Sequence, residues 1–274
     1  MFCIALVLLG ACPVLGDWIR DFRGEVVYDD NLSNSNRTTD QREDFAFAGR
    51  ASFGRFGELS DALRLTVTAD LEARAFARYD DFSSLTIEST AALRYRGGIG
   101  AMATFLRLEA NGGYAAFNQS LQSGGRFRTG LTVGKKLTER FALETSYFYE
   151  EIGGEIRVFD RFAHVFALHA SFDLTGKTRL SAGYELRSGE VLSYAVPPRP
   201  DIVALANDRR SVNTFGPPYV AYNLDALTNS LSLGVSQALT QFLSINARYD
   251  WQYTTRSHLS YTNNVLRLSI HAAF

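Results

Sequence analysis

Cysteine is almost absent from this sequence. Only Cys3 and Cys12 occur among the 274 residues, and both lie near the N-terminus. If that segment is cleaved off, the mature chain contains no cysteine, and thiol catalysis, disulfide bonds and cysteine-ligated metals are excluded for it. A strong net charge is also missing, since Lys and Arg together number 28 and Asp and Glu 29. This near neutrality gives no indication of a nucleic-acid partner.

Long apolar runs are confined to the N-terminus. The stretch MFCIALVLLGACPVLG has the apolar core and small closing residues of a secretory signal, so we expect residues 1–16 to be a signal peptide cleaved after Gly16. A lipoprotein signal in which Cys12 is lipidated is the alternative. No later stretch approaches the roughly 20 apolar residues of a membrane-spanning helix. Any membrane crossing by residues 17–274, which we expect to form a single domain, must therefore use strands.

The segment LRLTVTADLEARAFARY, from Leu63 to Tyr79, alternates apolar and polar residues almost without interruption. Period two predicts a strand, because successive side chains point to opposite faces. Its length of about 17 residues exceeds the roughly 5 to 6 of soluble proteins, whereas a tilted strand crossing a bilayer needs roughly 9 to 11 or more. Alternation alone does not identify the lipid face, because a soluble ligand-binding barrel has its apolar face inside and a membrane barrel has it outside.

The same period recurs along the chain and predicts twelve strands with polar connections. The expected strands run from Phe22 to Asp29, Asp44 to Phe56, Ala62 to Tyr79, Leu85 to Arg96, Thr104 to Phe117, Arg126 to Leu137, Phe141 to Tyr149, Phe162 to Leu174, Arg179 to Ser188, Leu227 to Leu239, Phe242 to Thr254 and Asn264 to Phe274. Links after even strands are short. Several links after odd strands are long, namely Asp30 to Glu43, Glu150 to Arg161 and the proline-containing Gly189 to Ala226. Short turns at one end and long loops at the other, with an even strand number, are typical of outer-membrane barrels.

Aromatic residues on the apolar faces gather near the predicted strand ends, as membrane-interface girdles require. The expected girdle residues are Tyr28, Tyr79, Tyr147, Tyr149, Trp251 and Tyr253 on the long-loop side and Tyr95, Phe141 and Phe274 on the other.

The C-terminal stretch NNVLRLSIHAAF places Leu266, Leu268, Ile270 and Phe274 on one face. In this respect the sequence resembles the bacterial outer-membrane β-barrel class, whose last strand characteristically ends in an aromatic residue. The resemblance is to the class and to no single member family. It implies a closed, antiparallel, all-β transmembrane barrel of about twelve strands in up-and-down order, in the outer membrane of a Gram-negative bacterium. It also implies contact with outer-membrane lipid and lipopolysaccharide, and recognition of the last strand by the barrel-assembly machinery.

With the apolar face in lipid, the ionic face lines the interior. That face carries about 15 basic and 11 acidic side chains in the predicted register. Arginine binds carboxylate or phosphate at two points, and rings of basic side chains in a narrow pore favour anions. The residues expected to line the lumen and contact solute are Arg64, Arg74, Arg78, Arg94, Arg107, Arg128 and Arg248, together with Asp70 and Glu72. The alternative is a barrel plugged by its own ion pairs, and the proline-containing loop could fold inward or stand outward.

Two motifs invite chemical roles. His169 and Ser171 form a His-x-Ser pair like that of lipid-modifying barrels. The apolar residues on either side of them are expected to face lipid, so both side chains are expected to point inward. A nucleophile also needs a base held in place by a third group, and the sequence indicates none here. The loop DDNLSNSNRTTDQRED is rich in oxygen ligands, yet its spacing matches no EF-hand. We therefore expect no metal, no cofactor and no enzymatic activity.

The sequence-based hypothesis is a porin-like channel for passive passage of small hydrophilic, anionic solutes. A non-conducting surface or assembly barrel linked to polysaccharide or surface-protein export is the second hypothesis. A lipid-modifying outer-membrane enzyme is the third.

Overall fold

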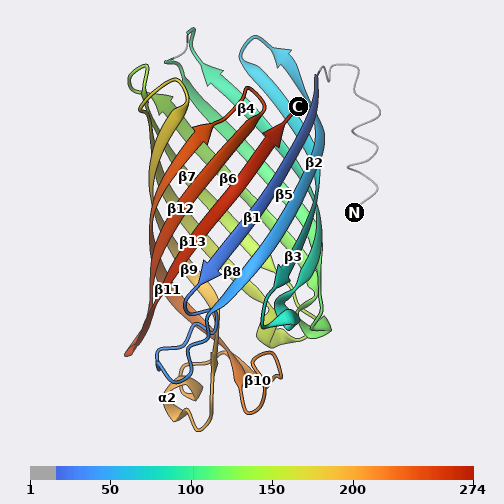
Figure 1. Ribbon diagram of the computed structural model, residues 1–274, viewed down its shortest axis with the longest axis vertical. Helices are drawn as coiled ribbons and strands as arrows, with labels where there is room; N and C mark the ends of the chain where they lie inside the picture. Colours follow the sequence, from blue (N-terminus) through green and yellow to red (C-terminus); the bar gives the residue numbers. More distant parts are fainter. Residues whose placement is uncertain (1–16, 101) are drawn as a thin grey trace.

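The strands of this protein close into one barrel, as Figure 1 shows for the computed structural model, which describes residues 17–100 and 102–274. Strand order is β10-β11-β12-β13-β1-β2-β3-β4-β5-β6-β7-β8-β9, and an additional pairing of β11 with β9 completes the ring. The barrel strands are β1 (Asp17–Asp29), β2 (Asp44–Ser60), β3 (Leu63–Phe76), β4 (Ser84–Gly97), β5 (Thr104–Phe117), β6 (Gly124–Lys136), β7 (Phe141–Ile152), β8 (Arg161–Asp173), β9 (Thr178–Ala195), β11 (Val220–Ala238), β12 (Leu243–Arg256) and β13 (Leu259–Ala273). The expected signal peptide lies outside the described residues.

Twelve strands make the wall, and every neighbouring pair is antiparallel. The first and last strands join directly, with Asp21 opposite Ala273 and Asp29 opposite Val265. The thirteenth strand, β10 (Asp208–Ser211), is short and pairs only with the outer end of β11. The predicted closed, up-and-down, twelve-stranded antiparallel barrel is therefore confirmed.

The outer surface of the barrel is apolar. On β3, Leu71 is 47% exposed whereas its neighbour Asp70 is only 6% exposed, and Phe22 on β1 is 59% exposed. Large apolar side chains with this exposure recur on almost every strand, as an encircling hydrocarbon phase requires. The two faces of the alternating strands are thus assigned: the leucines and aromatics face outward and the ionic residues inward. Within residues 17–100 and 102–274, no helix has the length and apolar character needed to cross a membrane.

The two ends of the barrel differ in their connections. Residues 61–62, 137–140, 174–177 and 239–242 form short turns at one end, where the C-terminus also lies (Figure 1). The other end carries residues 30–43 and three turns that each contain a 3-10 helix: η1 (Asp80–Phe82), η2 (Ser120–Gln122) and η3 (Arg157–Phe159). The link between β12 and β13 is the exception, because these strands continue to a two-residue turn at residues 257–258.

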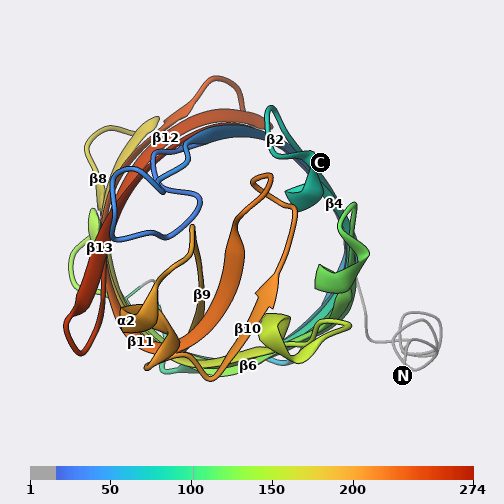
Figure 2. The same cartoon turned by 90° about the horizontal axis from the view of Figure 1, so that it is seen from below.

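Strands β9 and β11 are longer than predicted. They run to Ala195 and from Val220, so the expected loop from Gly189 to Ala226 shrinks to residues 196–219, which contain α2 (Pro200–Val203) and β10. Viewed from the long-loop end, this segment crosses the opening of the barrel (Figure 2). We call residues 196–219 the strap. It lies across the mouth, with α2 and β10 beyond the rim of the barrel (Figure 1), so its path combines the two orientations that the sequence left open.

Two predictions at the end of β3 are wrong. The alternating pattern continues to Tyr79, but the strand ends at Phe76 because the chain turns into η1. Tyr79 therefore packs against Phe215 of the strap, with ring centroids 4.7 Å apart, and does not join the membrane girdle. Arg78 lies in the same turn, where its guanidinium pairs with Glu43 at 3.5 Å, so it does not line the lumen wall.

Candidate functional site

The interior of the barrel holds two neighbouring polar cavities. The larger, of about 590 Å³, is lined by residues of β1–β5 and of β9, β11, β12 and β13, among them Arg23, Arg50, Asp70, Arg248 and Arg267. The second, of about 350 Å³, lies against β2–β7 and includes Arg74, Arg126 and Arg128. Arg50, Thr90 and Glu109 line both. The predicted lumen residues Arg74, Arg128, Arg248, Asp70 and Glu72 thus come together around one enclosed space.

Most arginines of this space are paired with a carboxylate, often on the same or the adjacent strand. Arg50 contacts Asp70 at 3.1 Å, Arg74 contacts Glu72 at 3.1 Å, and Arg128 contacts Glu150 at 3.1 Å. Cross-strand pairs of this kind satisfy charges inside small barrels. The interior is consequently a mixture of the two arrangements expected from the sequence, because ion pairs line the wall and substantial space remains between them.

In several lumen ion pairs the arginine is much more accessible than its carboxylate, whereas Arg74 and Glu72 are nearly equal at 33% and 28%. The Arg248 side chain is 56% exposed and that of Asp250 only 3%, and the values for Arg50 and Asp70 are 40% and 5%. Arg23 and Glu25 show the same order, at 48% and 11%. The carboxylates are recessed into the wall while the longer arginines extend above them. The charge met by a solute in the lumen is therefore more positive than the count of side chains suggests.

Hydrogen bonds hold the recessed carboxylates in place. Asp250 accepts from Nε of Arg248 at 2.6 Å and from Nε of Arg267 at 2.9 Å. Asp70 accepts from the Ser52 hydroxyl and from Nε of Arg50, the latter at 3.3 Å. A buried carboxylate needs such partners, because an unpaired charge in a wall of this kind is costly. The anchors fix the acids below the arginines.

A row of three arginines crosses β3, β4 and β5 near the short-turn end. Arg64 lies directly opposite Arg94, and Arg94 lies directly opposite Arg107. Arg64 pairs with Glu58 at 2.5 Å and Arg107 with Glu109 at 3.5 Å. Among the described residues Arg94 has no carboxylate within ion-pairing distance, and its guanidinium stacks 4.0 Å from the Phe105 ring centroid. We call Arg64, Arg94 and Arg107 the arginine row. Like charges directly opposite one another destabilise a sheet, so an anion is its natural counterpart.

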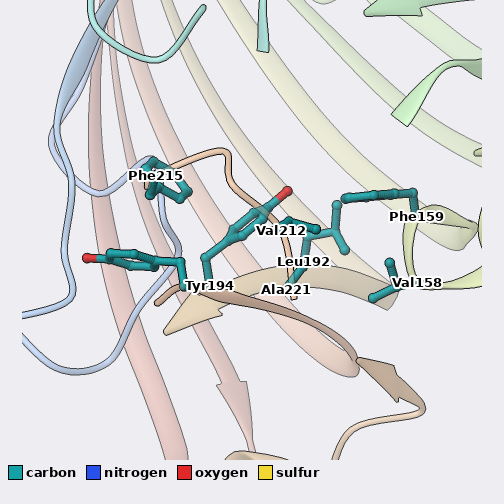
Figure 3. Close-up of a cluster of buried hydrophobic side chains, with 8 residues drawn as sticks. Val158, Phe159, Leu192, Tyr194, Val212, Phe215 and Ala221 are labelled. Atoms are coloured by element: carbon teal, nitrogen blue, oxygen red, sulfur yellow. The ribbon is translucent and has the colours of Figure 1, made fainter. Parts of the chain in front are cut away.

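An apolar cluster lies at the long-loop mouth. Figure 3 shows side chains from η3, β9, the strap and β11 converging there, including Val158, Phe159, Tyr194 and Phe215. Phe215 lies 5.3 Å from Phe82 and 5.1 Å from Tyr194, measured between ring centroids. Because Phe82 belongs to η1, between β3 and β4, the strap reaches the side of the ring opposite its origin at β9 and β11. Packed side chains therefore span the mouth along one diameter.

A buried arginine secures the strap to the β1–β2 loop. The Arg199 side chain is fully buried and donates to Asn36 at 2.6 Å and to Asp201 at 2.9 Å, with Asp40 at 3.5 Å. Asp40 also accepts a hydrogen bond from the Val196 backbone N–H at 3.3 Å. The hydrogen bonds from Arg199 lower the pKa of Asp201 to about 2. We call Arg199, Asp40 and Asp201 the latch.

The residues predicted for the membrane girdle and the assembly signal, apart from Tyr79, lie on the outer face. Tyr95, Tyr147, Trp251 and Tyr253 are each more than a third exposed, and Tyr28 and Tyr149 occupy outward positions of β1 and β7. Leu266, Leu268, Ile270 and Phe274 are likewise exposed on the outside. These positions are compatible with the predicted girdle and assembly signal, whose roles remain predictions. His169 and Ser171 occupy inward positions of β8, and Ser171 lines a cavity of about 180 Å³ near the short turns.

Sequence reasoning missed Asp21 and His271, which form a hydrogen-bonded pair across the β1–β13 seam and line the larger cavity. The predicted first strand began at Phe22, five residues after the observed start at Asp17, and so excluded Asp21. If the alternating pattern is extended from Arg23 back to Asp21, it places the Asp21 carboxylate on the inward face.

Comparison with known proteins supports the fold. No protein-family model matches the sequence, and no curated protein matches it. Among solved structures, the COG4313 outer membrane channel from Pseudomonas putida F1 matches with a TM-score of 0.62 at 13% identity, covering 96% of this chain and 98% of that one. The NanC porin matches with a TM-score of 0.49 at 11% identity, covering 92% and 98%. A KdgM porin in complex with oligogalacturonate matches with a TM-score of 0.47 at 10% identity, covering 94% and 99%. The chain thus has the fold of outer-membrane channel barrels, and its apolar exterior agrees with a location in the outer membrane.

Proposed function

We propose that this protein is an outer-membrane channel for small hydrophilic anions. The observation that carries the proposal is the unequal exposure within the lumen ion pairs, in which the guanidinium groups face the cavity and the carboxylates are recessed. The fold likeness supports a channel, because the matching Pseudomonas putida F1 protein is described as one.

A solute that enters the lumen meets the arginines before it meets the recessed carboxylates. An anion in the lumen can approach Arg23, Arg50 and Arg248 to hydrogen-bonding distance, whereas a cation is kept from Asp70 and Asp250 by the arginines above them. Two charges inside a narrow lumen interact more strongly than in bulk water, because the surrounding protein has a lower dielectric constant. Basic side chains in a narrow pore therefore favour anions. The arginine row extends the same preference towards the short-turn end.

This proposal assigns no catalytic role to the barrel. His169 and Ser171 face the interior, and neither side chain hydrogen-bonds to the other among the described residues. Incubating the purified protein with phospholipid and lipid A should release no fatty acid above the level given by an H169A/S171A variant. Release that depends on these residues would favour an enzyme.

Planar-bilayer recording tests the channel. Under a KCl gradient the wild-type protein should give a reversal potential of the sign set by chloride. The R248Q/R50Q variant should move that potential towards zero, while the outward-facing R20Q control should leave it unchanged. A cation-selective reversal potential, or stable insertion without conductance, would overturn the proposal.

The strap supports a second candidate function. A barrel whose mouth is closed by the strap and the latch can serve as a surface or assembly platform that does not conduct, for example beside a polysaccharide or surface-protein exporter. In that case the exposed loops would recruit the partner. Deletion of residues 193–218 should then abolish partner capture, and bilayers should show no current from wild type or from the deletion variant.

A further inference from the structure

One part of the lumen wall lacks large side chains. The inward positions of β9 and β11 hold Ser181 and Gly183 on one strand and Ser232, Gly234 and Ser236 on the other. Gly183 lies opposite Ser232, and Ser181 lies opposite Gly234. We call these five residues the Gly-Ser wall. Ser181, Gly234 and Ser236 line the larger cavity, alongside Asn246 of the adjacent strand β12.

Neither glycine is required by backbone conformation, since neither has a positive φ. A Cβ on Gly183 would lie 2.5 Å from the Ser232 hydroxyl, and one on Gly234 would lie 2.6 Å from the Ser181 hydroxyl. Each glycine therefore makes room for a serine on the neighbouring strand. Glycine within a strand weakens it and often marks a place where another group approaches closely. Here the open space next to Gly234 belongs to the larger cavity.

The hydroxyls of this wall are free to bind solute. Within the part of the chain that the structure describes, the side chains of Ser181, Ser232, Ser236 and Asn246 make no hydrogen bond to protein, whereas Ser52 is engaged by Asp70. A serine hydroxyl can both donate and accept, and so pairs with another hydroxyl in either direction. The wall is uncharged, so it neither attracts nor repels the ionic end of a solute.

The charged groups of the same cavity lie beside this wall. Arg248 and Arg267 are cross-strand neighbours on β12 and β13, and Arg23 and Arg50 are cross-strand neighbours on β1 and β2. All four line the cavity together with Ser181, Gly234 and Ser236 of the Gly-Ser wall. A solute with an anionic group at one end and hydroxyls along its body matches both surfaces at once.

Resting on the proposed channel function, we propose that the Gly-Ser wall makes the channel select polyhydroxylated organic anions over anions of similar length without hydroxyls. The arginines bind the acidic group, and the wall serines replace the water that solvates the solute hydroxyls. Gly183 and Gly234 provide the width for the hydroxylated body.

Gluconate and hexanoate provide the test, since both are six-carbon carboxylates and only gluconate carries hydroxyls on its chain. Under bi-ionic conditions we expect the wild-type channel to be at least about threefold more permeable to gluconate than to hexanoate, although gluconate is bulkier. Removing the hydroxyls in S181A/S232A/S236A should lower that ratio about fivefold, the size of one net hydrogen bond. The G183V/G234V variant should reduce gluconate current more than chloride current.

Matched controls lie on the outer face of the barrel. Gly49 has open space around its Cβ position and Ser89 faces outward, so G49V and S89A should change neither ratio. The serine-to-alanine variant keeps the test decisive if the valine variant does not fold. An anion-selective channel whose permeability to hexanoate equals or exceeds its permeability to gluconate would overturn this inference and leave the proposed function intact. Loss of anion selectivity itself would overturn the proposed function.

Discussion

The two ends of this barrel are built on opposite principles. At the long-loop end, the strap buries Phe215 among Tyr79, Phe82 and Tyr194 and spans the mouth with apolar packing. At the short-turn end, the connections are too short to cover the opening, and the arginine row faces the lumen with Arg94 unpaired by any described carboxylate. One end contributes stability through burial, whereas the other is held by the strand ladder despite repulsion between like charges.

In the channel that we propose, these two regions would have separate roles. The strap would limit entry, because its side chains lie across the opening. The arginines would set the preference between solutes, because they are more exposed than their carboxylate partners. Changes at one end should therefore alter the amount of current, and changes at the other should alter its ion preference.

The largest expected effect follows excision of the strap. Joining Val196 to Tyr219 through a Gly-Gly turn keeps the β9–β11 pairing, which begins at Ala195 opposite Val220. Single-channel conductance should rise several-fold because the apolar cluster loses its central side chains. The R209Q/R210Q variant, which alters exposed residues of β10 within the strap, should conduct like wild type. Equal conductance after excision would show that the strap does not limit entry.

The next effect should come from the latch. Replacing the fully buried Arg199 by alanine leaves Asp40 and Asp201 without their cation, which costs about 3 kcal/mol for a buried pair. Because the barrel wall is not involved, we expect local release of residues 190–222 while the remainder stays folded. Hydrogen exchange should show faster exchange in that segment alone. Protection unchanged from wild type would mean that the aromatic cluster holds the strap without Arg199.

A smaller effect should follow substitution in the arginine row. R94Q removes the cation that stacks on Phe105 and should lower the chloride-to-potassium permeability ratio about twofold, with R94E lowering it further. Conductance should change little, in contrast to the strap variants. Reversal potentials in asymmetric KCl provide the measurement, and R55Q, which alters an arginine stacked on Trp18 at the outer face, is the matched control. A ratio unchanged in R94E would exclude the row from ion selection.

The smallest effect concerns acid. Since the pKa of Asp201 is lowered to about 2 from its usual value of 3.8, its contribution to strap attachment is complete above about pH 4 and is lost as the pH falls towards 2. Cleavage of the strap by pepsin, measured at pH 4 and pH 2, should rise more on acidification in wild type than in D201N, because pepsin's own pH dependence is common to both proteins. An identical pH response in the two proteins would remove Asp201 from the attachment.

Most of the barrel was predictable from local pattern. Alternation predicted twelve strands, and it placed Leu71 outside and Asp70 inside, because period two fixes the face of each side chain once one face meets lipid. The wrong boundary at Tyr79 has a physical cause: an aromatic residue in phase with a strand looks the same whether it meets lipid or the side chain of Phe215, which lies far away in sequence.

The features on which the proposed function rests depend on contacts that no local sequence pattern records. The recessed position of Asp250 follows from its hydrogen bonds to Arg248 and Arg267, and the latter belongs to the next strand. The Gly-Ser wall follows from the register between β9 and β11, which the strap separates in sequence. Sequence reasoning therefore identified the charged lumen but not the accessibility of its charges.

The path of the strap has a mechanical consequence. The strap starts and ends at β9 and β11, and it contacts η1 between β3 and β4. Six strands lie between these two places on each side of the ring, namely β4–β9 on one side and β11, β12, β13, β1, β2 and β3 on the other. A segment that links strands on opposite sides of the barrel resists flattening of the circular cross-section into an ellipse. The cross-section at that rim should thus stay constant under lateral pressure from the bilayer, while the untied rim remains free to deform.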